Sequence, residues 1–261
     1  MKTIIVSFSG GRTSAYMSKL ILESPLYADA KKVFVFANTG KERPETLDFV
    51  NECDIRFGLN VVWLEAVVHH EKGVGTTYGI VDYQTASRKG EPFDNMIKKY
   101  GLPNNDFPHC TRELKEVPIR KFAMSICGTE YEIAIGIRAD ERKRVNRLRA
   151  DRNRWIYPLI DVYPTTKKHI SDFWNMQDFD LQLKDYEGNC DLCWKKSLNK
   201  RVRILSEHPE IGNQWSRWEM EDGEYVFDRD GYSIEQISQM ARLSLNQTVL
   251  DFSEHGCTCF F

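Results

Sequence analysis

Short, continuous apolar runs alternate with amphipathic segments over roughly the first 165 residues of this chain. Apolar runs typical of strands buried in a parallel sheet lie at 3–8, 33–37, 60–65, 131–137 and 156–162. Apolar residues at helical spacing lie between them at 14–23, 45–56, 93–100 and 112–126. This alternation predicts an α/β fold, an open, doubly wound, mostly parallel sheet with helices on both faces.

Beyond about residue 165 the pattern changes to helices and irregular connections. Helical spacing fits 168–176 and 194–206, and Ser233 opens a capping-box match for a helix that continues through about 245. We therefore expect two regions, an α/β domain at 1–165 and a smaller, mainly helical C-terminal region at 166–261. Residues 66–92 show neither period clearly, and we interpret them as a segment that covers the substrate.

Composition excludes several classes of protein. A net charge of −2 over 261 residues gives no global field that attracts nucleic acid, although the stretch Arg142–Arg154 is locally basic. No apolar run approaches the roughly 18 residues of a membrane span, and no leader precedes the first strand, so we expect a cytoplasmic protein. Seven cysteines in a reducing compartment argue against a disulfide scaffold and favour metal binding or thiol chemistry for some of them.

The most informative segment is the turn after the first strand, Ser9-Gly10-Gly11-Arg12-Thr13-Ser14. A glycine turn that opens a helix presents backbone N–H groups at the positive end of the helix dipole, where phosphate binds readily. The hydroxyl groups add donors, and Arg12 adds a positive charge. The spacing differs from that of the Walker loop and from the dinucleotide fingerprint. We predict that this turn binds the phosphate end of a nucleotide.

Three further segments carry candidate chemistry. They are Asn38-Thr39-Gly40-Lys41-Glu42-Arg43-Pro44-Glu45-Thr46, His109-Cys110-Thr111-Arg112-Glu113-Leu114-Lys115-Glu116-Val117-Pro118 and Gly136-Ile137-Arg138-Ala139-Asp140-Glu141-Arg142-Lys143-Arg144. Arg138 can pair a phosphate or sulfate bidentately, and Asp140 and Glu141 can bind Mg²⁺ through their oxygens. Lys115, two turns into a helix, can face a phosphoryl group. Taken alone, the first segment is an ordinary helix start and the third an ordinary charged loop.

Together, these four ordered motifs over roughly residues 3–165 resemble the PP-loop ATP pyrophosphatase superfamily. Within it, they resemble the family that includes the phosphoadenylylsulfate (PAPS) reductases. The resemblance implies an adenine nucleotide alpha-hydrolase-like, Rossmann-like fold that binds ATP or PAPS. The nucleotide-binding residues that it implies are Ser9, Gly10, Gly11, Arg12, Thr13, Ser14, Asn38, Thr39, Gly40, Glu42, Gly136 and Arg138. The chain departs from the family pattern at Arg142, where serine is usual, and at Arg12, where many relatives have lysine.

A C-x-x-C element, Cys190-Asp191-Leu192-Cys193, follows the sheet domain. Two thiolates at this spacing bind one iron or zinc atom, or form a redox pair. By the resemblance, Cys110 occupies a position that bears a cluster ligand in some relatives. The resulting hypothesis is a three-thiolate site for a [4Fe–4S] cluster, with Cys257 or Cys259 as a fourth ligand or with one iron open to bind sulfide. Structural Zn²⁺ and free or redox thiols are the alternatives.

Two enzymatic functions fit these motifs. In the first, a substrate oxygen attacks the α-phosphate of Mg²⁺-ATP, pyrophosphate and then AMP are released, and the activated substrate accepts sulfur from a persulfide or the cluster. The loop amides, Arg12, Lys115, Arg138 and Mg²⁺ would neutralise the leaving group. Such a protein is similar to tRNA thiolation and DNA phosphorothioation sulfurtransferases, so a nucleic-acid acceptor and a cysteine desulfurase or thiol reductant are the expected partners. Arg142–Arg154 would contact that acceptor, or is simply a solvated helix face.

In the second function, the chain is a PAPS or adenylylsulfate reductase that forms sulfite. The thiolate of Cys257 or Cys259 would attack the sulfate sulfur, although the tail departs from the Glu-Cys-Gly-x-His element of the family reductases. A third possibility, from a different class, is a nucleotide-binding regulatory protein that has lost turnover.

Overall fold

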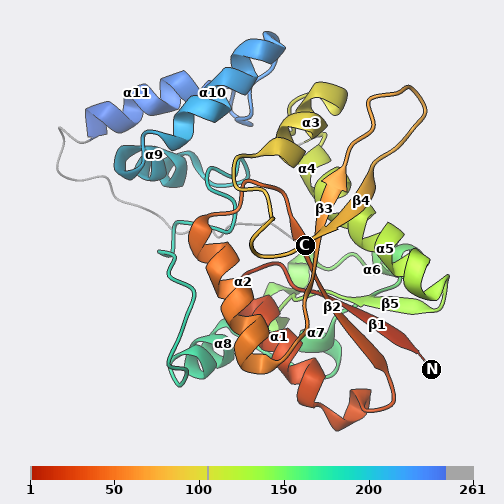
Figure 1. Cartoon of the computed structure of the whole chain (residues 1–261). Helices are drawn as coiled ribbons and strands as arrows, with labels where there is room; N and C mark the ends of the chain where they lie inside the picture. The colour runs from red at the N-terminus through yellow and green to blue at the C-terminus, as the bar shows by residue number, and fades with distance from the viewer. Residues whose placement is uncertain (1, 105, 245–261) are drawn as a thin grey trace.

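The computed structural model describes residues 2–104 and 106–244, and a single six-stranded sheet forms its centre (Figure 1). The strands are β1 (Thr3–Ser7), β2 (Lys31–Asn38), β3 (Val62–Val67), β4 (Thr77–Val81), β5 (Tyr131–Ala134) and β6 (Trp155–Ile156). Their spatial order is β4-β3-β2-β1-β5-β6. Neighbouring strands run parallel, except that β4 pairs antiparallel with β3. The predicted open, mostly parallel sheet is confirmed.

Helices cover both faces of the sheet. They are α1 (Arg12–Glu23), α2 (Pro44–Phe57), α3 (Glu91–Tyr100), α4 (His109–Thr111), α5 (Val117–Cys127), α6 (Arg147–Asn153), α7 (Pro158–Asp161), α8 (Lys167–Trp174), α9 (Leu198–Glu207), α10 (Ile211–Asp222) and α11 (Ile234–Ser244). Shorter helical turns are η1 (Pro25–Tyr27), η2 (Arg112–Glu116) and η3 (Ala139–Arg144).

The two faces of the sheet follow from the alternation of side chains along β1. Ile4 and Val6 point to one face, where they join a core cluster with residues of α1, α2 and α8. Ile5 points to the other face and packs in a cluster with residues of α5, α6 and α7. Every side chain of β1 is buried, and Ile4, Ile5 and Val6 form a continuous apolar run at its centre, as is typical of a strand covered on both faces.

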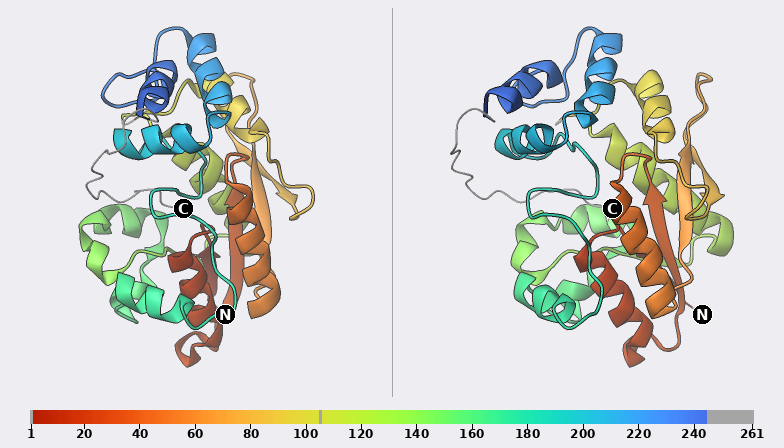
Figure 2. Two further views of the ribbon diagram at one scale, coloured as in Figure 1. Left: turned by 90° about the vertical axis from the view of Figure 1, so that its left-hand side faces the viewer. Right: turned by 60° about the vertical axis from the view of Figure 1, so that its left-hand side comes forward.

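The C-terminal helices α9, α10 and α11 form the mainly helical region that the sequence predicts, at one end of the molecule (Figure 2). Their core contains Trp215 and Trp218, both 0% exposed. The ring of Phe93, from α3, stacks on Trp218 at 5.1 Å, so this core continues into the α/β part of the chain. Helix α8 lies beyond residue 165, yet its Trp174 belongs to the core cluster of the sheet. The boundary at residue 165 stays a prediction.

One local expectation is wrong, and the expectation that residues 66–92 cover the substrate stays a prediction. The apolar run 156–162 is not a strand, because β6 ends at Ile156 and Pro158 begins helix α7. Proline has no N–H for a sheet and a φ suited to the first helical turn. Residues 66–92 contain the edge strand β4, and none of them lines the cavity described below. Within the described ranges, no helix is both long and apolar enough to cross a bilayer.

Candidate active site

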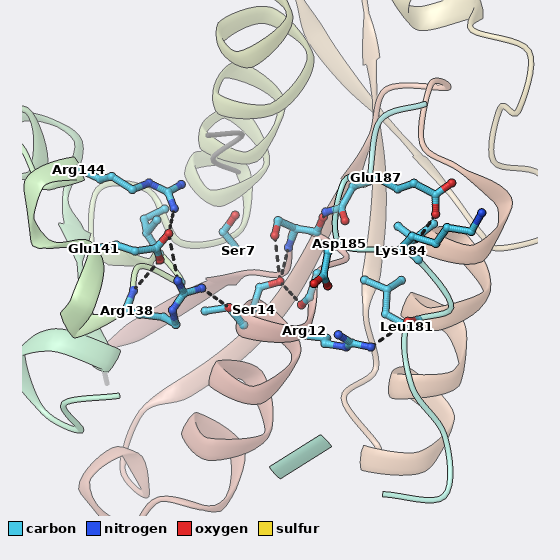
Figure 3. A pocket seen from close by; sticks show the side chains of 18 residues that line it. Ser7, Arg12, Ser14, Arg138, Glu141, Arg144, Leu181, Lys184, Asp185 and Glu187 are labelled. Carbon is cyan, nitrogen blue, oxygen red and sulfur yellow. Dashed lines mark hydrogen bonds and ion pairs between the residues drawn. The ribbon is translucent and has the colours of Figure 1, made fainter. Parts of the chain in front are cut away.

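The strand order determines where a ligand can bind. The chain moves from β1 to β2 on one side and later returns to β5 on the other side, so a crevice opens at the carboxyl ends of β1 and β5. A cavity of about 330 Å³ lies there. Its walls come from the β1–α1 turn, from the connection 135–144 and from the irregular segment 181–189 (Figure 3).

The β1–α1 turn presents the start of a helix to this cavity. Helix α1 has no side-chain cap at Gly11 and no acidic residue in its first turn, so its first amides are available to an anion. The Ser14 hydroxyl organises the turn, because it accepts from the Ser9 amide at 3.1 Å and donates to the Gly11 carbonyl at 2.9 Å. Gly10 has a φ of +80°, and a Cβ there would lie 2.6 Å from Cγ2 of Thr46. Glycine is therefore required where the turn packs on α2.

Arg138 contributes the second wall of the cavity. Its Nη1 donates to Oγ1 of Thr13 at 3.3 Å, and its Nε donates to Asp140 at 3.0 Å. Glu141 accepts from the Arg138 amide at 3.3 Å and also forms an ion pair with Arg144. Partial burial raises the pKa of Asp140, but hydrogen bonds from the Lys167 amide and Arg138 outweigh it, so the net shift is downward.

The third wall is the segment 181–189, which holds Arg12 away from the turn. Nε and Nη2 of Arg12 bind the Asp180 carboxylate at 2.6 and 2.5 Å. Lys184 binds Glu207 at 2.6 Å, and Glu187 binds the buried Arg43 at 3.0 Å. Asp185 is the remaining carboxylate of the wall, and it forms no ion pair with the described residues.

The segment after β2 forms a buried support and lines none of the cavity. The Glu42 carboxylate accepts from both the amide and the hydroxyl of Thr39 at 2.7 Å, and it pairs with Lys115 at 3.2 Å. The side chain of Glu42 is 0% exposed. Asn38 and Gly40 are buried beside them. Neither these predicted nucleotide-binding residues nor Lys115 lines the cavity, and their part in binding stays a prediction.

A main-chain ladder joins this support to the C-x-x-C turn. The Arg43 amide donates to the carbonyl of Asn189 at 2.7 Å, and the Asp191 amide donates to the carbonyl of Lys41 at 2.9 Å. Asn189 also donates from Nδ2 to the Ser9 carbonyl at 2.5 Å. Lys41 pairs with Asp191 at 2.6 Å. Burial raises the pKa of Asp191, and the positive charge of Lys41 offsets this shift only in part.

Cysteines predicted to bind metal lie near this ladder. Cys190 and Cys110 both pack against the core of the C-terminal helices, and Cys193 is buried. Within residues 2–104 and 106–244, no group of three or more His, Cys, Asp or Glu side chains is placed to hold a metal ion. Cys257 and Cys259 lie outside the described residues. The predicted cluster ligands stay a prediction.

Several cavity residues escape sequence reasoning. Of the predicted binding residues, the cavity is lined by Ser9, Gly11, Arg12, Thr13, Ser14, Gly136, Arg138 and Glu141. Ser7, Arg144, Lys184 and Asp185 also line it and are not predicted. Ser7 could be found from the sequence, because it is a polar residue in an otherwise apolar run. Its buried hydroxyl has no hydrogen-bond partner among the described residues. The segment 181–189 has no period, and only Gly188-Asn189 before the C-x-x-C element marks it.

Comparison with known proteins agrees with this arrangement. Residues 3–180 match the model of the phosphoadenosine phosphosulfate reductase domain. The chain belongs to this family. The match spans the β1–α1 turn, Arg138 and Asp180, and it ends before the cavity wall at 181–189. Membership of this family indicates nucleotide-binding, sulfur-related chemistry.

Relatives of the chain extend this picture. The chain is 35% identical over 255 residues to an uncharacterised nin region protein of Escherichia phage lambda. The aligned region covers 96% of this chain and 85% of that protein. The chain is also 26% and 23% identical to two uncharacterised proteins of Methanocaldococcus jannaschii. The chain spans only 42% and 50% of the lengths of these two proteins.

Proposed function

We propose that this protein binds ATP with Mg²⁺, adenylates a substrate oxygen with release of pyrophosphate, and supports the transfer of sulfur to the activated substrate. One observation carries this proposal. Asn189 lines the cavity and binds the Ser9 carbonyl of the phosphate-binding turn, and the next residue is Cys190. Because neighbouring Cα atoms are about 3.8 Å apart, the thiol turn begins directly at the edge of the nucleotide cavity.

The cavity supplies the groups that such a reaction requires. Amides at the start of α1 and the guanidinium of Arg138 would bind the phosphates, and Arg144 and Lys184 add positive charge. The buried Ser7 hydroxyl, which lacks a partner, would bind a polar group of the nucleotide. Arg12 would act through its fixed pair with Asp180.

Mg²⁺ fits one acidic side chain of the cavity better than the pair predicted from sequence. Glu141 pairs with Arg138 and Arg144, and Asp140 pairs with Arg138. Asp185 lines the cavity and is engaged by no described cation. We therefore assign Asp185 as the carboxylate that would hold Mg²⁺, which neutralises charge on the leaving pyrophosphate.

The reaction balances as two displacements. In the first, a substrate oxygen forms a bond to the α-phosphorus, and the bond between that phosphorus and the pyrophosphate oxygen breaks. In the second, a sulfur nucleophile attacks the carbon or phosphorus atom that bears the adenylated oxygen, the bond from that atom to the oxygen breaks, and AMP leaves with the oxygen. A persulfide donor would leave a disulfide behind, so this route also requires a thiol reductant. Lys115, buried against Glu42, would act by fixing the loop.

Cys110, Cys190 and Cys193 would hold a [4Fe–4S] cluster, which would supply sulfide or bind it at an open iron. A structural zinc ion is the competing occupant of the same thiols.

For the acceptor we propose a nucleic acid. Arg147 and Arg149 in the basic stretch are engaged by Asp161 and Glu116. Arg142, Lys143 and Arg152 are exposed and form no ion pair with the described residues. These three cations beside the cavity wall would contact a phosphate backbone.

The experiment is to incubate purified protein with Mg²⁺-ATP, a sulfide or persulfide donor and bulk tRNA or DNA. We expect equal amounts of AMP and pyrophosphate, and loss of both in Arg138→Ala. Release of ADP and inorganic phosphate would reject the reaction. Sulfite from PAPS and a thiol would assign the chain to the reductases instead, and tight ATP binding without turnover would indicate a regulatory protein.

A further inference from the structure

Three aromatic rings are stacked in a row around helix α4. The ring of Phe107 lies 5.9 Å from that of His109, with 16° between the two planes. The ring of His109 lies 5.7 Å from that of Tyr100, with 29° between the planes. Phe107 is 61% exposed, so the row ends on a ring that another planar group can reach.

A tight turn holds Phe107 in this position. The Oδ1 atom of Asn104 accepts from the amides of Asp106 at 3.0 Å and Phe107 at 2.9 Å. The Phe107 carbonyl accepts from the amide of His109 at 2.7 Å. Side-chain bonds of this kind fix the backbone of a turn. The ring is therefore ordered before any ligand binds, which lowers the entropic cost of stacking on it.

Positive charge lies beside the same rings. The guanidinium of Arg112 is 5.8 Å from the centre of the Tyr100 ring, and its Nη2 is 3.4 Å from Nδ1 of His109. Nζ of Lys99 is 5.3 Å from the centre of the Tyr100 ring. Arg112 is exposed, so its charge is accessible to a ligand. Stacking rings with cations beside them are typical of surfaces that bind bases joined by phosphates.

Arg112 connects the stack to a second cavity, of about 160 Å³, between the start of α5 and β6. Its walls also include Arg120, Asn153 and Trp155. The guanidinium of Arg149 lies 4.8 Å from the centre of a Trp155 ring, so the cavity adjoins the basic stretch Arg142–Arg154. Glu116 is the acidic residue of the wall, and Arg149 pairs with it at 2.5 Å.

We propose that this surface, from Phe107 through Arg112 to the basic stretch, binds a single-stranded nucleic acid. An unpaired base stacks on the ring of Phe107, the strand passes the second cavity, and Arg112 and Arg120 contact its phosphates. In a duplex the faces of the bases are covered by their neighbours, so a duplex cannot use Phe107 in this way. The assignment rests on the nucleic-acid acceptor of the proposed function and specifies it as a single strand.

The test is fluorescence anisotropy of the full chain, without ATP, with a short fluorescein-labelled oligothymidylate or its duplex with oligoadenylate. We expect tighter binding of the single strand. Phe107→Ala should weaken that binding about tenfold, the loss of one stacked base. Tyr225→Ala is the matched control, because this ring is also exposed, at 55%, and lies outside the surface. It should keep the wild-type affinity.

A second pair of variants tests the phosphate contacts. Arg120→Gln should weaken binding and reduce the slope of log affinity against log salt by about 0.7, the value for one phosphate of a single strand. Lys121→Gln removes the same charge from the next position of α5, where the side chain is exposed and outside the lining of the second cavity. This control should keep the wild-type slope. Phe107→Ala should also keep it, because stacking releases no counterions.

Several results would overturn the inference. One is a duplex that binds as tightly as the single strand. Another is a Phe107→Ala protein that loses no more affinity than Tyr225→Ala. Displacement of the strand by polyglutamate of equal charge would assign the surface to an acidic protein instead. If Phe107→Ala does not fold, Phe107→Leu keeps an apolar side chain without the ring, and a wild-type affinity in that variant rejects the proposal.

Release of AMP and pyrophosphate from Mg²⁺-ATP, measured on the same samples, tests the proposed function separately. Strand binding with the expected variant effects, but without AMP, would reject the proposed reaction alone. Release of AMP with a small acceptor, without binding of the strand, would reject the present inference alone.

Discussion

Gly10→Ala tests whether the close packing of the β1–α1 turn creates the nucleotide site. Gly10 has a φ of +80°, and an added Cβ would lie 2.6 Å from Cγ2 of Thr46. That contact is about 1 Å shorter than the ~3.5–4.0 Å optimum for two carbon atoms, so the turn or helix α2 must move. Left-handed backbone costs alanine about 1–2 kcal/mol, and overpacking adds about 1–3 kcal/mol. We expect a loss of about 2–5 kcal/mol in the free energy of unfolding.

Gly58→Ala is the matched control for this prediction. Gly58 ends α2 with a φ of +66°, and a Cβ there would meet no atom within 4 Å. This variant should lose only the backbone contribution of about 1–2 kcal/mol and should keep the wild-type affinity for ATP. Gly10→Ala should lose at least about tenfold in that affinity, since roughly 1.4 kcal/mol of misplaced contact is enough. Urea denaturation and calorimetric titration measure both quantities. Equal stability losses with equal ATP affinities would refute the reasoning.

Three further substitutions separate binding from support. Arg138→Lys keeps the charge but loses the planar fork, and we expect ATP affinity to fall about tenfold in calorimetry; an unchanged Kd would contradict bidentate binding. Ser7→Ala removes a buried hydroxyl that has no partner among the described residues, so ATP affinity should fall about threefold to tenfold while stability is unchanged. Ser18→Ala is the control for stability, because it breaks a 2.9 Å hydrogen bond and should lower the free energy of unfolding by about 1 kcal/mol. Glu42→Gln leaves Lys115 without its buried carboxylate, and urea denaturation should give a free energy of unfolding about 3 kcal/mol below that of the wild type. An unchanged free energy of unfolding would show that the 3.2 Å pair contributes little.

Local sequence determines the part of this site that is predictable. The turn Ser9–Ser14 could be predicted as a phosphate-binding turn because the strand, the two glycines and the helix start follow one another in the sequence. Arg138 lies in the connection shortly after β5, and parallel strands bring their carboxyl ends to one edge.

The remaining wall depends on contacts between distant residues. The hydrogen bond from Asn189 to Ser9 joins residues 180 apart in the chain, and the segment that carries it has no helical or strand period. Local patterns also do not show that Glu42 and Lys115 pair with each other, because the two residues are far apart in the sequence. Only the packing shows that the two side chains form an ion pair at 3.2 Å.

The main-chain ladder between 41–43 and 189–191 depends on the number of residues in each segment more than on their side chains. Its two rungs are main-chain hydrogen bonds, Arg43 to Asn189 at 2.7 Å and Asp191 to Lys41 at 2.9 Å, so most substitutions leave them unchanged. Insertion or deletion of one residue would shift the register and turn the alternate side chains to opposite sides. Homologues that keep the same spacing from this ladder to the C-x-x-C turn should keep that turn next to the cavity.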